Sequence, residues 1–516
     1  MPAPLAAPER VFRALAVRTA VADHDAFVPA VVPADNGDEA RYADKCATYT
    51  KGVLQTGIGL VDLAAYATFR RALASGDPAD FEGITLGGTR TLNGPQGGLA
   101  FDLESLDASQ FLVPPAPTLD SETYATELVE LYWAARLRDV AFTDYVGNPT
   151  ANDAATELST LSAYQGPRDM SNQVTPNLLF RGGFVGETVG PYLSQFLLRD
   201  ARFGALPIVQ RYATLKAGVD YMTDSLTFQQ VQNGISTGLP LQFQPPVYLH
   251  DGRGLGAYTH DDVLYQAYFT AYLVLNAING GASVPLNPGN PYHASLTQNG
   301  FNTFGQPDIA GLVASVAAQA LKAVWYQKWY VHLRHRPESG GAIVHLQKTG
   351  LGSTIEGQLS PIVLNSHAVQ ASHMTTGSYF LPQAFPEGSP THPAYPTGHG
   401  TVAGACITAL KFFYDGNFVI PAPKKPNGTG TALVDYTDAD AGDMTVNGEL
   451  NKLAHNISFG HGIHAGIHWR SDTDTSIRLG EAVALSVLRD RASTYNEKFT
   501  VRLQKLDGTT ATISNE

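Results

Sequence analysis

Residues 308–335 read DIAGLVASVAAQALKAVWYQKWYVHLRH and predict one long amphipathic helix. Its apolar side chains recur at steps of three and four, the period of an α-helix. They are Ile309, Leu312, Val313, Val316, Ala320 and Val324. Helical patterns also follow Glu122 and cover residues 400–413 and 475–493, whereas alternating runs such as Ala342 to Leu346 are too few for a main sheet. The sequence therefore predicts a mainly α protein built on a helix bundle.

Composition narrows the class of protein. The chain has 516 residues and a net charge of −13, and the absence of a basic run disfavours nucleic acid as a partner. Cys46 and Cys406 lack the spacing of a disulfide framework or a thiolate metal site. Neither a signal peptide nor an 18-residue apolar run is evident. We expect a soluble protein without a membrane span, cytoplasmic by default.

The composition of the chain changes near residue 120, where helical patterns begin. Residues 1–120 are rich in glycine, proline and aspartate, which predicts an irregular region packed on the bundle. Residues 121–516 form the predicted helical catalytic region, although no firm boundary separates the two parts. Long loops are expected at 237–258, 278–307 and 414–446, and such loops are usually functional or form oligomer contacts.

Two cationic side chains lie near the end of the helix predicted over residues 308–335. The apolar stripe, continued by four residues from Val324, reaches Lys328, and a buried lysine needs a partner anion to keep its charge. Pro337 is predicted to end the helix, which leaves Arg336 free to turn toward the same anion. The alternative is an ordinary amphipathic helix whose long side chains reach water.

A second segment, residues 390–399, reads PTHPAYPTGH and precedes a predicted helix. The amides at the start of that helix and the Thr397 hydroxyl would point at a bound anion, and Gly398 would let the backbone approach it closely. His399 is placed to exchange a proton with an oxygen of the anion. The alternative is a proline-rich turn with a threonine cap and an incidental histidine.

The third segment contains several histidines between residues 455 and 468. A helix predicted over 465–475 would place His468 and Asp472 one turn apart, so that Asp472 accepts a hydrogen bond from one ring nitrogen while the other faces the pocket. The spacing of three and four between His461, His464 and His468 also permits zinc. Core histidines with no chemical role are a further alternative.

These three segments, Lys-x7-Arg-Pro, Pro-Thr-Gly-His and His-x3-Asp, occur in the order found in vanadium-dependent haloperoxidases. That family shares the arrangement with type 2 phosphatidic acid phosphatases. Further stretches resemble the bromoperoxidases of red algae and their bacterial relatives, so that the resemblance covers most of the chain. They include Asn36-Gly37-Asp38-Glu39, Leu86-Gly87-Gly88-Thr89-Arg90, Gln96-Gly97-Gly98-Leu99-Ala100-Phe101 and Phe385-Pro386-Glu387-Gly388-Ser389-Pro390.

The resemblance implies a helix bundle that holds vanadate by one bond to a histidine, which matches His468. It implies that Lys328 and Arg336 clamp the anion's oxygens, and that His399 acts as the acid–base group. The hydroxyl of Thr397 stands where the family has serine, and the Gly398 amide matches a further donor. His392 matches a second pocket histidine of the algal bromoperoxidases, where chloride-oxidising relatives have an aromatic residue.

One position departs from the family pattern. The family places an arginine six residues before the ligand histidine, and here that position is Gly462. The preceding Ile457-Ser458-Phe459-Gly460 suggests a one-residue insertion, which would align His461 with the arginine. An imidazole donates singly and is charged only when protonated, so His461 is an incomplete substitute for a guanidinium.

Three hypotheses follow. The first is a bromoperoxidase that uses hydrogen peroxide to oxidise bromide or iodide and then halogenates an organic acceptor. The second is a phosphatase with His468 as nucleophile, and the third is an oxyanion-binding protein without turnover. The resemblance also implies a large homo-oligomer, such as a dodecamer, and a structural calcium ion, for which the loop at 287–298 is a weak candidate.

Overall fold

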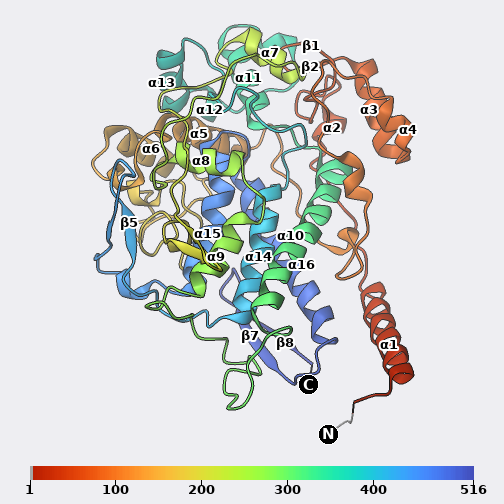
Figure 1. Cartoon of the computed structure of the whole chain (residues 1–516). Coiled ribbons are helices and arrows are strands. Elements are labelled where there is room, and N and C mark those ends of the chain that lie inside the picture. Colours follow the sequence, from red (N-terminus) through yellow and green to blue (C-terminus); the bar gives the residue numbers. More distant parts are fainter. Residues whose placement is uncertain (1–3, 516) are drawn as a thin grey trace.

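The computed structural model describes residues 4–515 and is mainly helical, as the sequence predicted. The centre is a bundle in which α14 contacts α10, α15 and α16 (Figure 1). Every residue of α14 is buried. The core helices are α5 (Glu122–Leu137), α10 (Gln306–Tyr326), α14 (Gly398–Phe413), α15 (Val446–Phe459) and α16 (Arg470–Ala492).

Shorter helices and four antiparallel hairpins surround this bundle. The other α-helices are α1 (Ala7–Ala26), α2 (Asp38–Arg41), α3 (Leu63–Ser75), α4 (Pro78–Glu82), α6 (Pro149–Thr160), α7 (Ser225–Gln232), α8 (Gly252–His260), α9 (Gln266–Leu275), α11 (Pro337–Lys348), α12 (Pro361–Leu364) and α13 (His367–Thr376). The hairpins pair β1 (Gln55–Gly57) with β2 (Leu60–Val61), β3 (Ala201–Phe203) with β4 (Leu206–Ile208), β5 (Lys424–Pro426) with β6 (Leu433–Asp435), and β7 (Thr500–Gln504) with β8 (Thr510–Ser514). No sheet within residues 4–515 has more than two strands.

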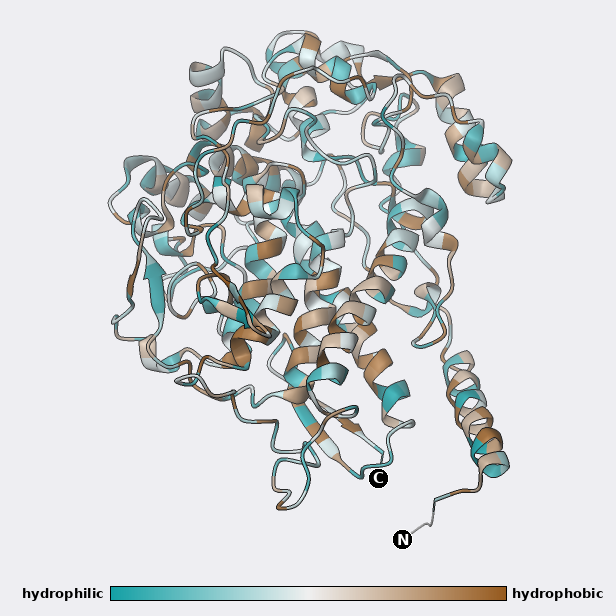
Figure 2. Cartoon of the chain, in the orientation of Figure 1, coloured by the Kyte–Doolittle hydropathy of each residue, from teal (hydrophilic) through white to brown (hydrophobic). Residues whose placement is uncertain are grey.

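The two central helices approach each other unusually closely because glycines line their contact. A Cβ atom on Gly404 would lie 1.9 Å from the carbonyl oxygen of Ile477, and one on Gly480 would lie 2.0 Å from that of Thr401. No side chain fits at either position, so these glycines set the spacing between α14 and α16. Figure 2 shows hydrophobic residues concentrated along these central helices.

The predicted helix over 308–335 is shorter than expected. Regular α10 ends at Tyr326 and continues as a π-helical turn, η6 (Gln327–His332), which stops at Leu333 with φ of 45°. Pro337 does not end this helix but begins α11, because a proline in the first turn needs no amide partner. Residues 342–346, interpreted above as an alternating run, lie inside α11, where burial against neighbouring elements overrides the local pattern.

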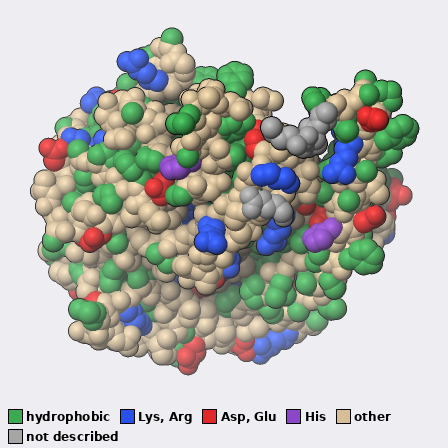
Figure 3. Space-filling view, turned by 90° about the horizontal axis from the view of Figure 1, so that it is seen from below, with side chains coloured by type: hydrophobic (Ala, Val, Ile, Leu, Met, Phe, Trp, Pro, Cys, Tyr) green, Lys and Arg blue, Asp and Glu red, His purple; other side chains and the backbone are tan. Residues whose placement is uncertain are grey.

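The N-terminal region contains more helix than the sequence suggested, although its connections are irregular. Val53 and Phe69 belong to a small core that Trp329 and Leu333 of the bundle region complete. Helix α1 projects from the edge of the molecule (Figure 1) and has no buried residue. Hydrophobic side chains gather in Figure 3 on the right, the side on which Figure 1 places α1. A division at residue 120 stays a prediction.

One helical stretch, Gln306–His332, is long and apolar enough to cross a membrane by length and composition. It comprises α10 and η6, and α10 contacts α14 and α16 within the bundle. Its apolar stripe, from Ile309 to Val324, is buried there as the sequence predicted. The packing of the bundle therefore accounts for its composition. The cytoplasmic location stays a prediction.

Candidate active site

The three predicted segments meet at one end of the central bundle. Lys328 comes from η6, Thr397 from the start of α14, and His468 from the loop before α16. Lys328, Arg336, Thr397, His468 and Asp472 are at most 1% exposed, whereas His392, His399 and His461 keep 7–8% of their surface. The first five residues therefore form the floor of the site, and the other three, all histidines, lie nearer to solvent.

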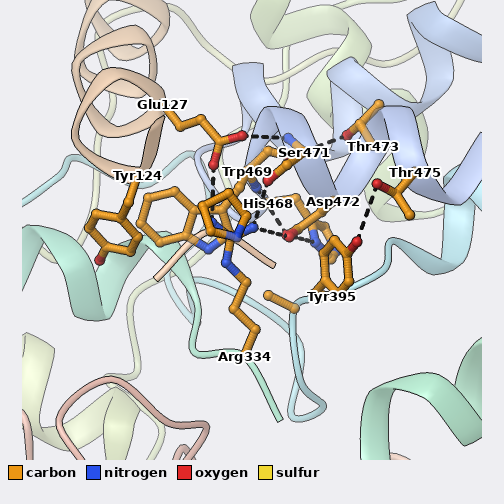
Figure 4. Close-up of polar contacts among 12 residues, drawn as sticks. Tyr124, Glu127, Arg334, Tyr395, His468, Trp469, Ser471, Asp472, Thr473 and Thr475 are labelled. Atoms are coloured by element: carbon orange, nitrogen blue, oxygen red, sulfur yellow. Dashed lines mark hydrogen bonds and ion pairs between the residues drawn. The ribbon is translucent and has the colours of Figure 1, made fainter. Parts of the chain in front are cut away.

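The ligand candidate His468 is held by Asp472. Nδ1 of His468 donates to Oδ2 of Asp472 over 2.9 Å, as the sequence predicted, and the same oxygen accepts from the amide of Trp469 over 3.1 Å (Figure 4). The predicted helix over 465–475 is wrong in its start, because α16 begins at Arg470. Gly466, with φ of 84°, keeps the preceding residues out of the helix. Asp472 therefore acts from the first turn of α16 on a residue just outside it.

A buried ion-pair network supports Asp472 from behind. Nη1 of Arg334 lies 2.6 Å from Oδ1 of Asp472, and its Nη2 lies 3.0 Å from Oε2 of Glu127 (Figure 4). The other oxygen of Glu127 accepts from the amide of Ser471 over 2.7 Å. Sequence reasoning missed Arg334 and Glu127. A carboxylate within the apolar pattern of α5 was the available signal, because buried charges need partners.

Lys328 and Arg336 differ from the cations of that network because their hydrogen-bond acceptors are uncharged. Nζ of Lys328 donates to the carbonyls of Pro393 and Ala394, each over 2.8 Å. Burial, with the nearby charge of Arg336, lowers the pKa of Lys328 well below its usual 10.5, and burial lowers that of Arg336 to about 10. Neither is in an ion pair with a carboxylate in residues 4–515, so an anion between them would compensate their charge.

Arg336 links the separate segments. Its Nε and Nη1 donate to the carbonyls of His392 and Ile467, each over 2.9 Å. Nη1 also lies 2.8 Å from Nε2 of His468, and Nη2 lies 3.0 Å from Nδ1 of His392. The ring of His392 lies against that of Trp325, with centroids 4.8 Å apart. Arg336 thus holds the second pocket histidine and the ligand candidate around one guanidinium.

The start of α14 supplies hydrogen-bond donors. Thr397 is the residue before the first helical turn, but its side chain makes no capping bond. Its Oγ1 atom is buried and has no hydrogen-bond partner among the described residues. A Cβ on Gly398 would lie 3.2 Å from the ring of Trp325, so this glycine allows the indole to pack on the turn. A hydroxyl without a capping bond at a helix N-terminus fits the predicted anion contact better than it fits the alternative of a threonine cap.

His399 is positioned by a carboxylate that the sequence analysis did not identify. Its Nε2 atom donates to Oδ1 of Asp262 over 3.1 Å. Its ring stacks on His461, with centroids 3.8 Å apart and planes inclined by 29°. The hydrogen bond to Asp262 leaves Nδ1 of His399 as the nitrogen that can accept a proton. Asp262 follows α8 in a loop region, where no periodic pattern marks it.

His461 occupies a π-helical turn, η9 (Gly460–His464), that follows α15. A π turn holds one residue more than the α-helical turn that it replaces, and the one-residue insertion suggested by the sequence stays a prediction. The His461 and His468 ring centroids are 5.6 Å apart. A Cβ on Gly462 would lie only 3.0 Å from Cβ of His468, so position 462 has little room for a side chain. Burial and the neighbouring His399 lower the pKa of His461 well below its usual 6.5.

Comparison with known proteins agrees with this geometry. The family described as the VCPO second helical-bundle domain matches residues 309–497, which include the pocket residues named above except Asp262 and Glu127. The vanadium-dependent bromoperoxidase of Corallina officinalis is 32% identical, over 95% of this chain and 96% of its own length. That of Corallina pilulifera is 33% identical over 94% and 95%. The chain belongs to the vanadium-dependent haloperoxidase family.

A solved structure of the family extends the likeness to nearly the whole fold. It is the homohexameric second vanadate-dependent bromoperoxidase of Ascophyllum nodosum, with a TM-score of 0.93 and 27% identity, covering 99% of this chain and 91% of its own. The family fold predicted from the resemblance is therefore confirmed. Calcium at the loop 287–298 stays a prediction, and no group of three histidine, cysteine or acidic side chains suited to a metal occurs within residues 4–515.

Proposed function

We propose that this chain is a vanadate-dependent haloperoxidase that uses hydrogen peroxide to oxidise bromide or iodide. The product is a hypohalous species that halogenates an organic acceptor. One observation carries the proposal: Lys328 and Arg336 are both buried, neither is in an ion pair with a carboxylate within residues 4–515, and Nη1 of Arg336 lies 2.8 Å from Nε2 of His468. Nδ1 donates its proton to Asp472, so Nε2 carries the lone pair that a metal would take in place of the Arg336 hydrogen bond.

The residues present fit vanadate. His468 would bind vanadium, Lys328 and Arg336 would neutralise its oxygens, and the Thr397 hydroxyl and the Gly398 amide would donate hydrogen bonds. The unpartnered, buried Thr397 Oγ1 supports this assignment because a buried hydroxyl without an acceptor or donor is costly. When bound, vanadate supplies a Lewis-acidic centre that activates peroxide for attack by halide.

His399 is the proposed proton-transfer group. Asp262 holds Nε2–H, so Nδ1 is the basic nitrogen that would take a proton from hydrogen peroxide and later return one. Lys328, at the floor of the pocket, would stabilise negative charge that develops on the reacting oxygens. His392 lies beside Arg336 at the more exposed side of the site, and we infer from it a preference for bromide or iodide over chloride.

His461 takes the place of the family arginine in this proposal. The η9 turn brings its ring against His399, and its Nδ1 atom is buried without a partner among residues 4–515. One imidazole N–H can donate to the anion, whereas a guanidinium would offer a bidentate, permanently charged contact. We therefore expect weaker vanadate retention than an arginine at this place would give.

We also infer that the enzyme is a homo-oligomer. The support is the solved Ascophyllum nodosum neighbour, which is homohexameric and matches 99% of this chain. A hexamer is therefore the first size to test, ahead of the dodecamer expected from the sequence. Hydrogen peroxide, halide and an organic acceptor are the proposed small-molecule partners.

One experiment tests the function. The protein is reconstituted with vanadate and assayed for peroxide- and bromide-dependent bromination of a dione dye, beside hydrolysis of an aryl phosphate without peroxide. Bromination that requires vanadate, with little hydrolysis, is the expected result. Hydrolysis alone would favour a phosphatase with His468 as nucleophile, and tight vanadate binding with neither activity would favour a non-catalytic oxyanion-binding protein.

A further inference from the structure

The segment 387–394 carries the carbonyl groups that hold both cations of the candidate site. The carbonyl of His392 accepts from Nε of Arg336 over 2.9 Å, and those of the next two residues accept from Nζ of Lys328 over 2.8 Å. The segment belongs to no helix or strand, and its two prolines lack amide donors. The positions of these carbonyls therefore depend on anchors from other parts of the chain.

Lys51, from the N-terminal region, is one such anchor. Its Nζ atom donates to the carbonyls of Glu387 and Ser389 over 2.8 Å and 2.6 Å, and it lies 2.6 Å from Oε1 of Glu338. Lys51 and Glu338 are each 2% exposed. One buried ammonium group therefore joins the N-terminal region, the first turn of α11 and the start of the segment 387–394.

The carboxylate of Glu338 holds the same turn. Oε2 accepts from the amide of Ser389 over 2.7 Å, and Oε1 accepts from the Ser389 hydroxyl over 2.9 Å and from Nε2 of Gln232 over 2.8 Å. Gly388 has φ of 60°, and a Cβ atom there would overlap Oε2, so the turn closes on the carboxylate only with glycine. Burial alone would raise the pKa of Glu338, but Lys51 and these hydrogen bonds keep it below its usual 4.5. Glu338 is therefore ionised at neutral pH.

A second anchor lies two residues further along the segment. The hydroxyl of Thr391 donates to the carbonyl of Thr91 over 2.6 Å, and its amide donates to Oδ1 of Asn93 over 3.2 Å. The amide of Asn93 donates in return to the carbonyl of Thr391 over 2.9 Å. The N-terminal region therefore holds the segment at two points, Ser389 and Thr391, immediately before the carbonyls that hold the two cations.

We propose that Lys51 and Glu338 are positioning residues for vanadate binding. They fix the segment 387–394, and the carbonyls of that segment fix the directions in which Lys328 and Arg336 point. The inference rests on the vanadate site proposed above and gives the N-terminal region a part in it. The alternative is a buried ion pair that stabilises the fold and has no specific effect on the site.

The test compares Lys51→Met with Lys452→Met in the full-length protein. Lys452 is a matched control, because Lys452 with Glu449 and Lys51 with Glu338 are both ion pairs of 2.6 Å between side chains that are 2% and 1% exposed. Nζ of Lys452 also donates to a carbonyl, that of Val189, outside the segment 387–394. Titration calorimetry with vanadate should show about 10–100-fold weaker binding in Lys51→Met, the usual effect of removing support behind a metal site. Lys452→Met should bind vanadate as the wild type does.

A double variant separates positioning from stability. Lys51→Met leaves the Glu338 charge buried without its cation, so its Tm should fall. Lys51→Met/Glu338→Gln removes that charge and should recover part of the Tm. Vanadate binding should stay weak, because the carbonyls of Glu387 and Ser389 still lack the ammonium donor. Recovery of affinity together with Tm would show that the pair serves stability alone.

The remaining outcomes are also decisive. Wild-type affinity in Lys51→Met, or an equal loss in Lys452→Met, overturns the positioning role and leaves the vanadate site standing. A wild type that does not bind vanadate overturns both. Circular dichroism checks that each variant folds. If Lys51→Met does not fold, Ser389→Ala replaces it, since it removes the hydroxyl that donates to Glu338 and should also weaken vanadate binding. Unchanged affinity in that variant overturns the proposal.

Discussion

Nδ1 of His468 lies 2.9 Å from Oδ2 of Asp472, and this contact decides which nitrogen of His468 faces the pocket. The carboxylate accepts the Nδ1 proton, and Arg336 donates to Nε2 over 2.8 Å. Nε2 therefore carries the lone pair, which a metal needs from a neutral imidazole. Because Arg334 and Glu127 fix Asp472, the orientation of the ligand depends on residues that do not contact the pocket.

Asp472→Asn should weaken vanadate binding about 10–100-fold, the usual effect of removing a carboxylate behind a ligand histidine. The asparagine amide is a weaker acceptor and can also turn its NH₂ group toward His468. Titration calorimetry with vanadate measures the change. Asp474→Asn on the same helix is the control, and equal losses in the two variants would contradict the role given to Asp472.

His468→Ala and His399→Ala should separate binding from chemistry. The first removes the proposed vanadium ligand, so the protein should not retain stoichiometric vanadium after gel filtration. The second removes the base held by Asp262, so it should keep vanadium but lose bromination by about 10²–10⁴-fold. Elemental analysis and the dye assay are the measurements. Stoichiometric vanadium in His468→Ala would show that the ligand is another residue.

His461→Ala should weaken vanadate binding about tenfold, equivalent to one hydrogen bond of about 1.4 kcal/mol to a charged group. His461→Arg should bind at least as tightly as the wild type, because a guanidinium at this turn restores a permanent charge. Calorimetry with vanadate, and with phosphate as a redox-inert analogue, gives both affinities. If His461→Ala binds as the wild type does, the imidazole makes no contact with the anion.

Arg334→Met should destabilise the fold by about 3–5 kcal/mol, because it leaves Glu127 and Asp472 buried without their cation. Differential scanning calorimetry measures the fall in Tm. Adding Glu127→Gln should recover part of the loss, since one buried charge is then removed. A double variant no more stable than Arg334→Met would mean that charge is not the cause.

His332 should make the protein sensitive to acid. Burial lowers its pKa to about 4, and neither ring nitrogen has a hydrogen-bond partner among the described residues. Because the folded pKa lies below the unfolded value of 6.5, this stability is fully present above about pH 6.5 and is lost as the pH falls toward 4. The loss is about 2 kcal/mol at pH 5. His332→Gln should therefore lose less Tm between pH 7 and pH 5 than the wild type does.

The sequence alone was sufficient to predict the main helices and the short motifs of the site. The stripe from Ile309 to Val324 predicted α10 because burial of one helix face has a period that can be read along the chain. The short motifs predicted Lys328, Thr397 and His468 as neighbours, and the structure brings them together. The predicted helix ends were less accurate than the predicted helices. Leu333 and Gly466 interrupt the helices with positive φ angles, which the adjacent residues do not indicate.

Only the tertiary structure revealed the groups that orient the site. Arg334 meets Glu127 and Asp472 from positions 207 and 138 residues away along the chain, and Asp262 meets His399 across 137 residues. The apolar side chains of a helix recur at a regular spacing, but a single buried charge leaves no such pattern in the sequence. Its partner is therefore fixed by the packing of distant elements and not by the neighbouring residues. The sequence determined which side chains carry the chemistry, and the packing of the bundle decided which atoms of them face the anion.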